Sequence, residues 1–331
     1  MDLPSIFAIA DDLTGALEVG SKFAAMGLET RVTTKLSPGQ CGIFVFDTES
    51  RHLSAPEAAA RVEALAAELS KDAPRLIYKK TDSTLRGNIA AELGALAKVF
   101  PDRKIIFVPA YPAMGRTVRT GELLVDGIPV HETAMSQDKL NPIHSSSIQA
   151  CLGDLEAIIF DGETDADIRR AARHILERGA PVIVAGPAAI AGALAAQYTL
   201  PPSRLKMPSL MRCLVINGSL HPVSTHQIAS HSFDENWIRF EYEASEQGLD
   251  RANRLGLQVR SLLTEAHFDA IIVFGGDTAF GIHQALGAVD FESCGEILPG
   301  LPLSKSQELY WITKAGGFGK ADLLQRLREK L

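Results

Sequence analysis

Four blocks of polar or glycine-rich residues each follow a short apolar run of strand length. Two are rich in charged and hydroxyl side chains, within residues 10–15 and 79–88, and two are rich in glycine, within 274–278 and 313–319. Open α/β sheets bind ligands beyond the carboxyl ends of their strands. The first two blocks suit an anionic, hydroxylated ligand, and the last two suit phosphates held by backbone amides. Together they predict a small-molecule kinase.

The first block places Asp11 and Asp12 between a strand and a helix that we expect to begin near Gly15. Aspartate is favoured at the N-cap, where its carboxylate accepts backbone N–H groups at the positive end of the helix. We expect one of the two carboxylates to cap this helix and the other to face a cleft. There it would bind a substrate hydroxyl or act as a general base.

The second block, Lys79–Asn88, follows the expected strand Leu76–Tyr78 and gathers two ammonium groups, a guanidinium, a carboxylate, hydroxyls and an amide. Lys80 and Arg86 are suited to holding a substrate carboxylate, because arginine binds carboxylates through a bidentate fork. The candidates for contacting substrate hydroxyls are Asp82, Ser83 and Asn88. The alternative is a helix cap with surface salt bridges. Asp82 is also, with Asp12, a candidate for orienting or deprotonating the reacting hydroxyl, and the sequence does not rank the two.

The glycine-rich blocks each lie between an expected strand and an expected helix. Glycine lets the backbone approach a phosphate, and a helix N-terminus supplies free N–H groups. The expected nucleotide-binding residues are Ser219, Gly275, Gly276, Asp277, Thr278, Gly316 and Gly317. Asp277 would repel a phosphate unless a divalent cation such as Mg²⁺ lies between them, and its alternative role is an N-cap. Lys314 either neutralises developing charge or is a surface residue at a strand end.

Motifs of several other enzyme classes are missing. The sequence has no GxxxxGK[ST] phosphate loop, GxGxxG dinucleotide fingerprint, GxSxG nucleophile elbow or HExxH zinc motif. His221, His226 and His231 recur at intervals that do not align them on one helix face, so we expect no zinc site. Hydride transfer and serine hydrolysis therefore lose support, whereas a kinase without a Walker motif remains possible.

Apolar runs of strand length recur along the chain, mostly with helix-period segments between them, which predicts an α/β fold with largely parallel sheets. The runs are Ile6–Ala10, Ile43–Phe46, Leu76–Tyr78, Ile105–Val108, Ile158–Phe160, Val182–Ala185, Leu214–Ile216, Trp237–Tyr242, Ile271–Phe274 and Tyr310–Thr313. A proline-rich stretch without periodicity predicts a linker at 201–212. We therefore expect two α/β domains, residues 1–200 and 213–331, with a ligand cleft between them.

The stretch Met114–Pro142 fits neither a helix nor a regular strand, and it is long for a connection inside a compact domain. Loops of this length are often functional. Arg116, Arg119 and His131 are its candidate ligand contacts, with Arg116 placed among the substrate-binding residues. The alternative is a solvated excursion.

Composition narrows the class of partner. A formal net charge of −7 over 331 residues argues against a general nucleic-acid binder. No apolar stretch approaches the roughly 20 residues of a membrane span. The four cysteines lie far apart, and the chain starts without a basic or apolar leader, so we expect free thiols and a cytoplasmic protein. We expect no nucleic-acid or membrane partner, and a homo-oligomer is left open.

The sequence resembles the four-carbon acid sugar kinases, a family with an N-terminal sugar-binding domain and a C-terminal nucleotide-binding domain. The matching segments run nearly end to end in the expected order. They are ADDLTGA (10–16), DTESRHL (47–53), KKTDSTLRGN (79–88), PAYPAMGRT (109–117), DGIPVHET (126–133), GGDTA (275–279), GEILPGLP (295–302) and TKAGGFG (313–319).

The resemblance implies ATP-dependent, Mg²⁺-assisted phosphorylation of the terminal hydroxyl of a tetronic acid, such as threonate, erythronate or an oxo-tetronate. It makes residues 1–200 the acid-sugar-binding domain, with contacts around Asp11, Asp12, Lys80, Asp82 and Arg86. It makes residues 213–331 the nucleotide-binding domain, with contacts on Ser219, Gly275 to Thr278, Gly316 and Gly317.

Two other hypotheses stay open. One is isomerisation or dehydration of an acid sugar, with a metal at the paired aspartates, but this chemistry has no use for two phosphate-like glycine turns. The other is a sensor that binds a sugar acid and a nucleotide without turnover. Binding of both ligands without phosphate transfer would favour the sensor.

Overall fold

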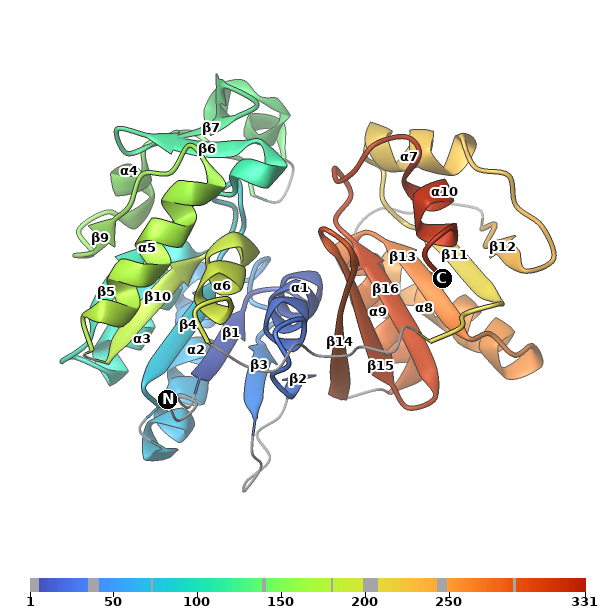
Figure 1. Ribbon diagram of the computed structural model, residues 1–331, viewed down its shortest axis with the longest axis horizontal. Helices are drawn as coiled ribbons and strands as arrows, with labels where there is room; N and C mark the ends of the chain where they lie inside the picture. Colours follow the sequence, from blue (N-terminus) through green and yellow to red (C-terminus); the bar gives the residue numbers. More distant parts are fainter. Residues whose placement is uncertain are drawn as a thin grey trace.

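The computed structural model describes residues 6–34, 42–72, 74–138, 141–179, 181–198, 208–242, 249–287 and 290–331. Two lobes lie side by side, one formed by the residues up to 198 and the other by those from 208 onward (Figure 1). Each lobe combines a sheet with helices packed on it, which confirms the expected α/β fold class. Most of the expected linker, residues 201–207, lies outside the described residues.

The N-terminal half is built on a parallel sheet with the strand order β2-β3-β1-β4-β10-β5-β9. Its strands are β1 (Ile6–Ala10), β2 (Thr30–Thr33), β3 (Ile43–Asp47), β4 (Leu76–Lys80), β5 (Lys104–Phe107), β9 (Ile158–Ile159) and β10 (Val182–Gly186). Its helices are α1 (Leu13–Ala24), α2 (Ala55–Leu69), α3 (Ile89–Val99), α4 (Ile148–Leu152), α5 (Asp165–Glu177) and α6 (Ala188–Ala195). Helix α6 packs between α1 and α5 in one layer, and α2 packs on α3 in the other (Figure 1).

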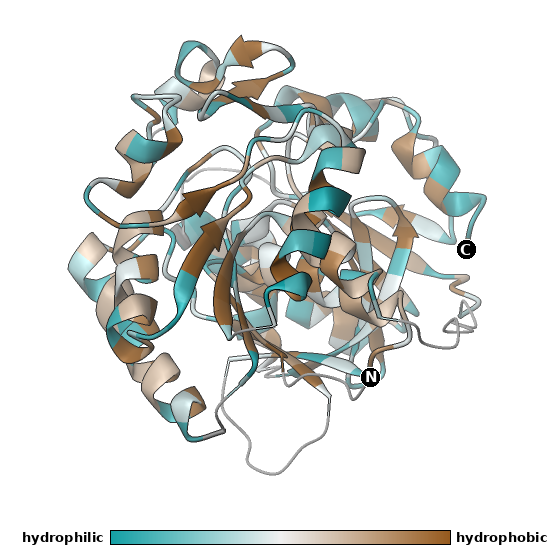
Figure 2. Cartoon of the chain, turned by 60° about the vertical axis from the view of Figure 1, so that its left-hand side comes forward, coloured by the Kyte–Doolittle hydropathy of each residue, from teal (hydrophilic) through white to brown (hydrophobic). Residues whose placement is uncertain are grey.

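The central strands are continuous apolar runs because both of their faces are covered. Every residue of β3, β4 and β10 is buried. Figure 2 shows strongly hydrophobic strands in the interior of the molecule, with helices of mixed hydropathy around them. Full burial of the strands leaves their carboxyl ends, and the loops that follow, as the places where polar side chains gather.

The C-terminal half has a mixed sheet in which β12, β11, β13 and β16 are parallel, followed by antiparallel β15 and β14. The strands are β11 (Cys213–Asn217), β12 (Trp237–Arg239), β13 (Ala270–Phe274), β14 (Asp290–Leu298), β15 (Leu301–Ser306) and β16 (Leu309–Lys314). The helices are α7 (Pro222–Ala229), α8 (Leu249–Glu265), α9 (Gly276–Leu286) and α10 (Leu323–Arg328). The sequence reasoning missed β14, in which buried residues alternate with more exposed ones, and β15, whose sequence LPLSKS is half polar. Neither strand contains a continuous apolar run.

The two halves share one sheet. Strand β14 pairs antiparallel with β2, with Asp290 opposite Thr33 and Glu292 opposite Arg31. The described strands other than β6, β7 and β8 therefore form a single 13-stranded sheet. The sequence analysis missed β2 and did not expect this continuity, because no local pattern reveals a pairing between residues so far apart along the chain.

The stretch Met114–Pro142 is more regular than the sequence indicated. It contains a three-stranded antiparallel sheet of β6 (Arg116–Arg119), β7 (Glu122–Val125) and β8 (Ile128–Pro129), followed by the short 3₁₀ turns Val130–Glu132 and Ala134–Gln137. The expectation of an irregular loop is thus wrong for these strands. They are too short to give a periodic signal, and glycines with positive φ at their turns, such as Gly121 and Gly127, masked the hairpins.

No helix among the described residues is both long enough and apolar enough to cross a membrane.

Candidate functional site

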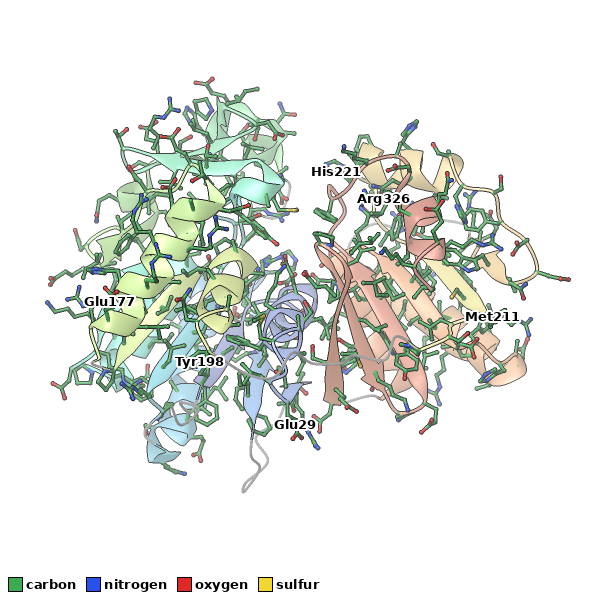
Figure 3. All side chains as sticks on the ribbon, viewed as in Figure 1. Glu29, Glu177, Tyr198, Met211, His221 and Arg326 are labelled. Atoms are coloured by element: carbon green, nitrogen blue, oxygen red, sulfur yellow. The ribbon has the colours of Figure 1, made fainter. Side chains whose placement is uncertain are left out.

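A cavity of about 690 Å³ lies between the two halves, at the carboxyl ends of β1, β3, β4, β11, β13 and β16. Side chains from both lobes point toward the space between them, His221 among those of the C-terminal half (Figure 3). The wall of the cavity includes nearly all of the site residues that the sequence selected. They are Asp12, Lys80, Asp82, Ser83, Arg86, Arg116, Ser219, Gly275, Gly276, Asp277, Thr278, Gly316 and Gly317. Asp11 and Asn88 do not line the cavity.

The paired aspartates are held by an arginine that sequence reasoning did not select. Arg51, which follows β3, donates from Nε and Nη2 to Asp11 at 2.8 and 2.9 Å, and from Nη1 and Nη2 to Asp12 at 2.9 and 2.8 Å. Asp12 also caps α1 by accepting from the Gly15 amide at 3.0 Å. The expectation that one aspartate caps the helix while the other faces the cleft is therefore wrong, because Asp12 does both.

Asp11 is a buried structural partner of Arg51 and is only 2% exposed. Burial favours its neutral form, but the guanidinium of Arg51 and the nearby Lys79 outweigh burial and lower the pKa of Asp11. A charged Asp11 in turn fixes the Arg51 side chain beside the cavity. Asp11 therefore supports the site from behind instead of contacting a substrate.

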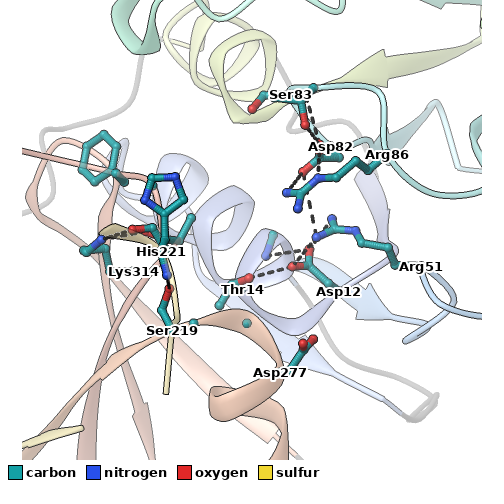
Figure 4. Close-up of a pocket in the computed structure, with 18 of the residues that line it drawn as sticks. Asp12, Thr14, Arg51, Asp82, Ser83, Arg86, Ser219, His221, Asp277 and Lys314 are labelled. Carbon is teal, nitrogen blue, oxygen red and sulfur yellow. Dashed lines mark hydrogen bonds and ion pairs between the residues drawn. The ribbon is translucent and has the colours of Figure 1, made fainter. Parts of the chain in front are cut away.

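Asp82 and Arg86 form a bidentate pair, with Arg86 Nη2 2.9 Å from Asp82 Oδ1 and Nε 3.1 Å from Oδ2 (Figure 4). Asp82 also accepts from the backbone and hydroxyl of Thr84. Although burial opposes charge on Asp82, Arg86 and Arg51 hold its pKa well below the usual range. The remaining guanidinium nitrogen of Arg86, Nη1, lies 3.3 Å from Asp138.

Lys80 has a different environment from the two arginines. Its ammonium donates to the Thr81 carbonyl at 3.0 Å, and no carboxylate of a described residue lies within salt-bridge distance of it. The Lys80 ammonium lies beside Gly15 in the first turn of α1, where a Cβ atom on Gly15 would be only 3.0 Å from Nζ. A cation next to a helix N-terminus is well placed to bind an anionic group.

Asn88 supports a loop and has no role in the cavity wall. Its amide nitrogen donates to the carbonyls of Ser50 and Leu53 at 3.0 and 2.9 Å. These bonds fix the segment that carries Arg51. The expectation that Asn88 binds a substrate hydroxyl is wrong, since both of its amide hydrogens are used by the backbone.

Three further carboxylates near this wall have raised pKa values. Burial, aided by Asp47, raises the pKa of Glu49 to about 11, and burial raises that of Asp47 to about 7. Glu49 accepts from the Leu13 amide at 2.9 Å and has a left-handed φ of 44°. Burial also raises the pKa of Glu18, which accepts from the Tyr111 hydroxyl at 3.1 Å. Sequence reasoning missed Glu18 and Glu49, although Glu49 lies within the segment 47–53.

The opposite wall belongs to the C-terminal half and consists of three closely packed turns. The first contains Gly218 and Ser219, the second Gly275 to Thr278, and the third Gly316 and Gly317. A Cβ atom at Gly218 would lie 1.8 Å from Thr278 Oγ1, and one at Gly316 would lie 2.4 Å from Ser219 Oγ. Glycine at these two positions is therefore required by contacts between the turns themselves. The sequence analysis attributed such glycines to approach of a phosphate alone, which is incomplete.

The two walls meet at the N-termini of α1 and α9. A Cβ atom at Gly276, the first residue of α9, would lie 3.1 Å from Thr14 Oγ1 and 3.4 Å from Asp12 Oδ2. The carboxylate of Asp12 therefore lies close to the N-terminus of α9, whose first N–H groups have no partner within the helix. Because α9 begins at Gly276, the glycine-rich block itself forms the first turn of the helix.

Asp277, in the first turn of α9, contacts the other half of the molecule. Its Oδ1 lies 3.3 Å from His52 Nε2, and this hydrogen bond lowers the pKa of Asp277. Its side chain is half exposed, so it is accessible from the cavity. No cluster of three or more potential metal ligands occurs among the described residues.

The ammonium of Lys314 is buried behind the Gly316–Gly317 turn and does not point freely into the cavity. Its ammonium donates to the carbonyls of Ala315 and Gly316 at 2.8 and 2.9 Å and to Ser224 Oγ at 3.2 Å. Burial lowers the pKa of Lys314 to about 7. The alternative of an exposed strand-end residue is wrong, and the contacts make Lys314 a support for the Gly316–Gly317 turn.

His221 lies in this wall as the N-cap of α7. Its Nδ1 accepts from the Val223 amide at 3.2 Å, so the proton of the neutral ring is on Nε2. Burial lowers the pKa of His221, and the charges of Lys314, Arg116 and Arg86 lower it further. Two of those cations belong to the N-terminal half, which shows how closely the walls approach each other here.

The other candidates from residues 114–142 lie elsewhere. Arg119 is exposed and pairs with Glu163, and neither Arg119 nor His131 lines the cavity. These two expectations are wrong. Arg116, at the opposite end of β6 from Arg119, does line the cavity.

Comparison with known proteins matches both halves of the chain. Residues 6–157 match the family model described as a sugar-binding N-terminal domain, and residues 231–324 match that of a nucleotide-binding C-terminal domain. A D-threonate kinase of Bordetella bronchiseptica is 29% identical, with 99% of this chain and 98% of that protein covered. A 3-oxo-tetronate kinase of Pectobacterium atrosepticum is 24% identical, with 97% and 98% covered. The chain belongs to the four-carbon acid sugar kinase family.

A solved structure of a Bordetella bronchiseptica protein described as a domain of unknown function is also similar. It is 27% identical, has a TM-score of 0.56, and covers 99% of this chain and 98% of its own. That protein was crystallised with bound citrate as a domain-swapped dimer.

Among the residues that this member of the four-carbon acid sugar kinase family brings to its cavity, Arg51 was the largest omission of the sequence analysis. It lies in DTESRHL, a segment quoted for the family resemblance, directly after the apolar run Ile43–Phe46. The rule that polar residues after a strand face the site would have selected it.

Proposed function

We propose that the protein is an ATP-dependent kinase that phosphorylates the terminal hydroxyl of a four-carbon sugar acid, such as threonate, erythronate or a 3-oxo-tetronate. The proposal rests on one observation above all. The acid-lined wall and the glycine-turn wall belong to a single cavity, and Asp12 of the first faces the N-terminus of α9 in the second. The names of the similar kinases support the same substrate class.

In this proposal Asp12 orients the reacting hydroxyl and accepts its proton. Both of its oxygens are fixed by Arg51, Thr14 and the Gly15 amide, which directs the carboxylate toward Gly276. Asp82 accepts as many hydrogen bonds as Asp12, so occupancy does not separate the two. Asp12 Oδ2, however, lies 3.4 Å from the Cβ position of Gly276 at the start of α9, whereas Arg86 and Arg51 hold the pKa of Asp82 well below the usual range. The geometry therefore favours Asp12 over Asp82 for this role.

Lys80 is the residue best suited to the substrate carboxylate. Its ammonium has no carboxylate partner among the described residues, whereas Arg86 is already paired with Asp82 and Asp138. Ser83 borders the same part of the cavity and is available to a substrate hydroxyl. Arg86 then holds Asp82 in place and adds positive charge, instead of binding the carboxylate by the expected fork.

The nucleotide would lie on the turns that contain Ser219, Gly275 to Thr278, and Gly316 with Gly317. These residues fit a phosphate chain, because Gly275 adopts a φ of 112° that opens the first turn of α9 and exposes its N–H groups. ATP would supply the phosphoryl group, and Mg²⁺ would neutralise charge on its phosphates. Asp277 is the carboxylate available to that ion, and one or two carboxylates plus phosphate oxygens suffice for Mg²⁺.

The test is a coupled ADP-release assay with ATP, Mg²⁺ and the D and L forms of threonate, erythronate and their oxo derivatives. Substrate-dependent ADP release, with a phosphorylated acid as product, is the expected result. Omission of Mg²⁺ should stop the reaction. Binding of both ligands without ADP release would instead support the sensor hypothesis, and conversion of the acid without ATP would support an isomerase or dehydratase.

The cytoplasmic location stays a prediction from the sequence, and the oligomeric state stays open. Size-exclusion chromatography with light scattering would decide the oligomeric state.

A further inference from the structure

Arg116 differs from the other two guanidinium groups in the cavity wall. Arg51 is paired with Asp11 and Asp12, and Arg86 is paired with Asp82 and Asp138, so both are neutralised by the protein itself. No carboxylate of a described residue lies within salt-bridge distance of Arg116. Like Lys80, Arg116 is therefore a cation of the cavity wall whose charge is not neutralised by a carboxylate of the described residues.

The hydrogen bonds of Arg116 lead to the same conclusion. Its Nη1 donates to the carbonyl of Met114, and its Nε is buried without a hydrogen-bond partner. A buried, unsatisfied N–H of a charged group costs stability unless a ligand later accepts from it. The guanidinium is thus held by one neutral acceptor and retains several N–H donors for an anion.

The backbone under Arg116 is rigid, so its side chain starts from a fixed position. Arg116 exchanges two backbone hydrogen bonds with Tyr111, at 2.7 and 3.1 Å. The preceding Gly115 adopts a left-handed φ of 72°, and its carbonyl accepts from the Asp126 amide at 2.7 Å. A Cβ atom at Gly115 would lie 2.0 Å from Asp126 Oδ1, so only glycine fits this corner.

Arg116 lines the same cavity as His221 and Gly317 of the opposite wall. The imidazole of His221 lies against Gly317, at 3.1 Å from the position of a Cβ atom there, and the charge of Arg116 contributes to lowering the pKa of His221. Lys80, the proposed carboxylate anchor, lies beside Gly15 at the start of α1. Because Lys80 serves the carboxylate, the phosphoryl group is the anion left for Arg116.

We propose that Arg116 binds the phosphoryl group during its transfer, donating to the oxygens on which negative charge develops, and that it does not bind the carboxylate of the sugar acid. This assignment rests on the proposed kinase function. In the transfer, the hydroxyl oxygen forms a bond to phosphorus as the bond from phosphorus to the β-phosphate oxygen breaks. The hydroxyl proton goes to Asp12, and ADP leaves with the electron pair of the broken bond. A fixed arginine at such a site stabilises the transition state more than the ground state.

The first experiment compares Arg116→Ala with wild type in steady-state kinetics. We expect kcat to fall roughly 10²- to 10³-fold, the usual loss when one charge-stabilising donor is removed, while the KM for the sugar acid changes little. Added guanidinium should restore part of kcat in Arg116→Ala, an effect that loss of a purely structural residue would not show. Arg119→Ala, on the same strand but exposed and paired with Glu163, is the matched control and should retain wild-type kcat.

The second experiment separates phosphate binding from carboxylate binding. Wild type should bind ADP with aluminium fluoride and sugar acid far more tightly than ADP with sugar acid alone, and Arg116→Ala should lose most of that difference. If Arg116 instead held the carboxylate, the variant would raise the KM for the acid at unchanged kcat. It would also lose discrimination between the acid and the corresponding uncharged tetritol. Either of those results would overturn the assignment.

The two levels of inference fail differently. Absence of turnover by folded wild-type protein across the acid panel would count against the proposed kinase itself. Wild-type turnover that Arg116→Ala fully retains would overturn only the role given to Arg116. Circular dichroism of both arginine variants shows whether a loss of activity reflects unfolding.

Discussion

The two walls of the cavity recognise ligands by different means. The wall from the N-terminal half is made of charged side chains, with Arg51 paired to Asp11 and Asp12 and Arg86 paired to Asp82. The wall from the C-terminal half is made of backbone turns packed so closely that Gly218 and Gly316 have no room for a methyl group. The structure of the first wall therefore depends on the charges of its side chains, and that of the second depends on the small volume of its glycines.

This difference fits the two kinds of ligand in the proposed function. A small, hydroxylated acid carries few atoms, so its recognition needs several directed charges and hydrogen bonds. A phosphate chain is recognised through N–H groups at helix N-termini, which any sequence can supply provided that side chains stay out of the way. A change of charge at constant shape should damage the first wall, whereas a single added methyl group should damage the second.

The largest effect is expected from Asp12→Asn, which removes charge with almost no change in shape. Asparagine is as good an N-cap as aspartate, so α1 should remain intact. Loss of the proton acceptor should lower kcat about 10²- to 10⁴-fold. Steady-state kinetics, with thermal unfolding as the folding check, measures this. Near-normal kcat would show that Asp12 is not the base and would return attention to Asp82.

The next largest effect is expected from Gly316→Ala, which adds volume without charge. The new Cβ atom would lie 2.4 Å from Ser219 Oγ, so the turn must shift. A displacement of this size should raise the KM for ATP roughly 10- to 100-fold and leave the KM for the acid unchanged. Kinetics with each substrate varied in turn gives both constants.

Gly94→Ala is the matched control for that variant. Gly94 lies inside α3, and a Cβ atom there meets nothing within 4 Å. Its kinetics should equal those of wild type, with stability raised by up to about 1 kcal/mol. If the two alanine variants bound ATP equally well, the contrast between a charge-dependent wall and a volume-dependent wall would be wrong.

A pH-dependent effect is expected from Lys314→Met. The unfolded chain keeps the lysine proton up to about pH 10.5, whereas the folded protein releases it near pH 7, because burial lowers the pKa of Lys314. Folding therefore releases a proton in this window, and wild-type stability should rise relative to the variant between pH 7 and about 10. Thermal unfolding of both proteins across this range measures the difference. Parallel curves would show that Lys314 titrates normally in the fold.

The smallest kinetic effect is expected from Asn88→Ala. Loss of its hydrogen bonds to the Ser50 and Leu53 carbonyls should lower stability by about 1–3 kcal/mol. Both Michaelis constants should stay close to wild type, since Asn88 does not line the cavity. Denaturant unfolding and kinetics test the two parts separately, and a large rise in the KM for the acid would restore Asn88 as a substrate contact.

Most of the residues that the sequence selected line the cavity, because they follow buried strands. Lys80 ends β4 and Gly275 follows β13, and the apolar segments Leu76–Tyr78 and Ala270–Phe274 of these strands are fully buried in a covered sheet. Arg51 follows β3 in the same way, so the same rule applies to it, although the sequence analysis did not select it. The strands β6 to β8 were missed because strands of only two to four residues show no hydrophobic periodicity by which a strand can be recognised.

The sequence by itself determined the class of fold, the places where polar residues meet strand ends, and the type of group at each place. Only the tertiary structure decided which carboxylates are already in ion pairs. Asp82 pairs with Arg86, and Asp11 pairs with Arg51. The tertiary structure also decided that β14 pairs with β2 and so sets the two walls against each other. The physical reason is range: strand and helix patterns arise from neighbouring residues, whereas ion pairing and sheet closure depend on residues brought together from distant parts of the chain.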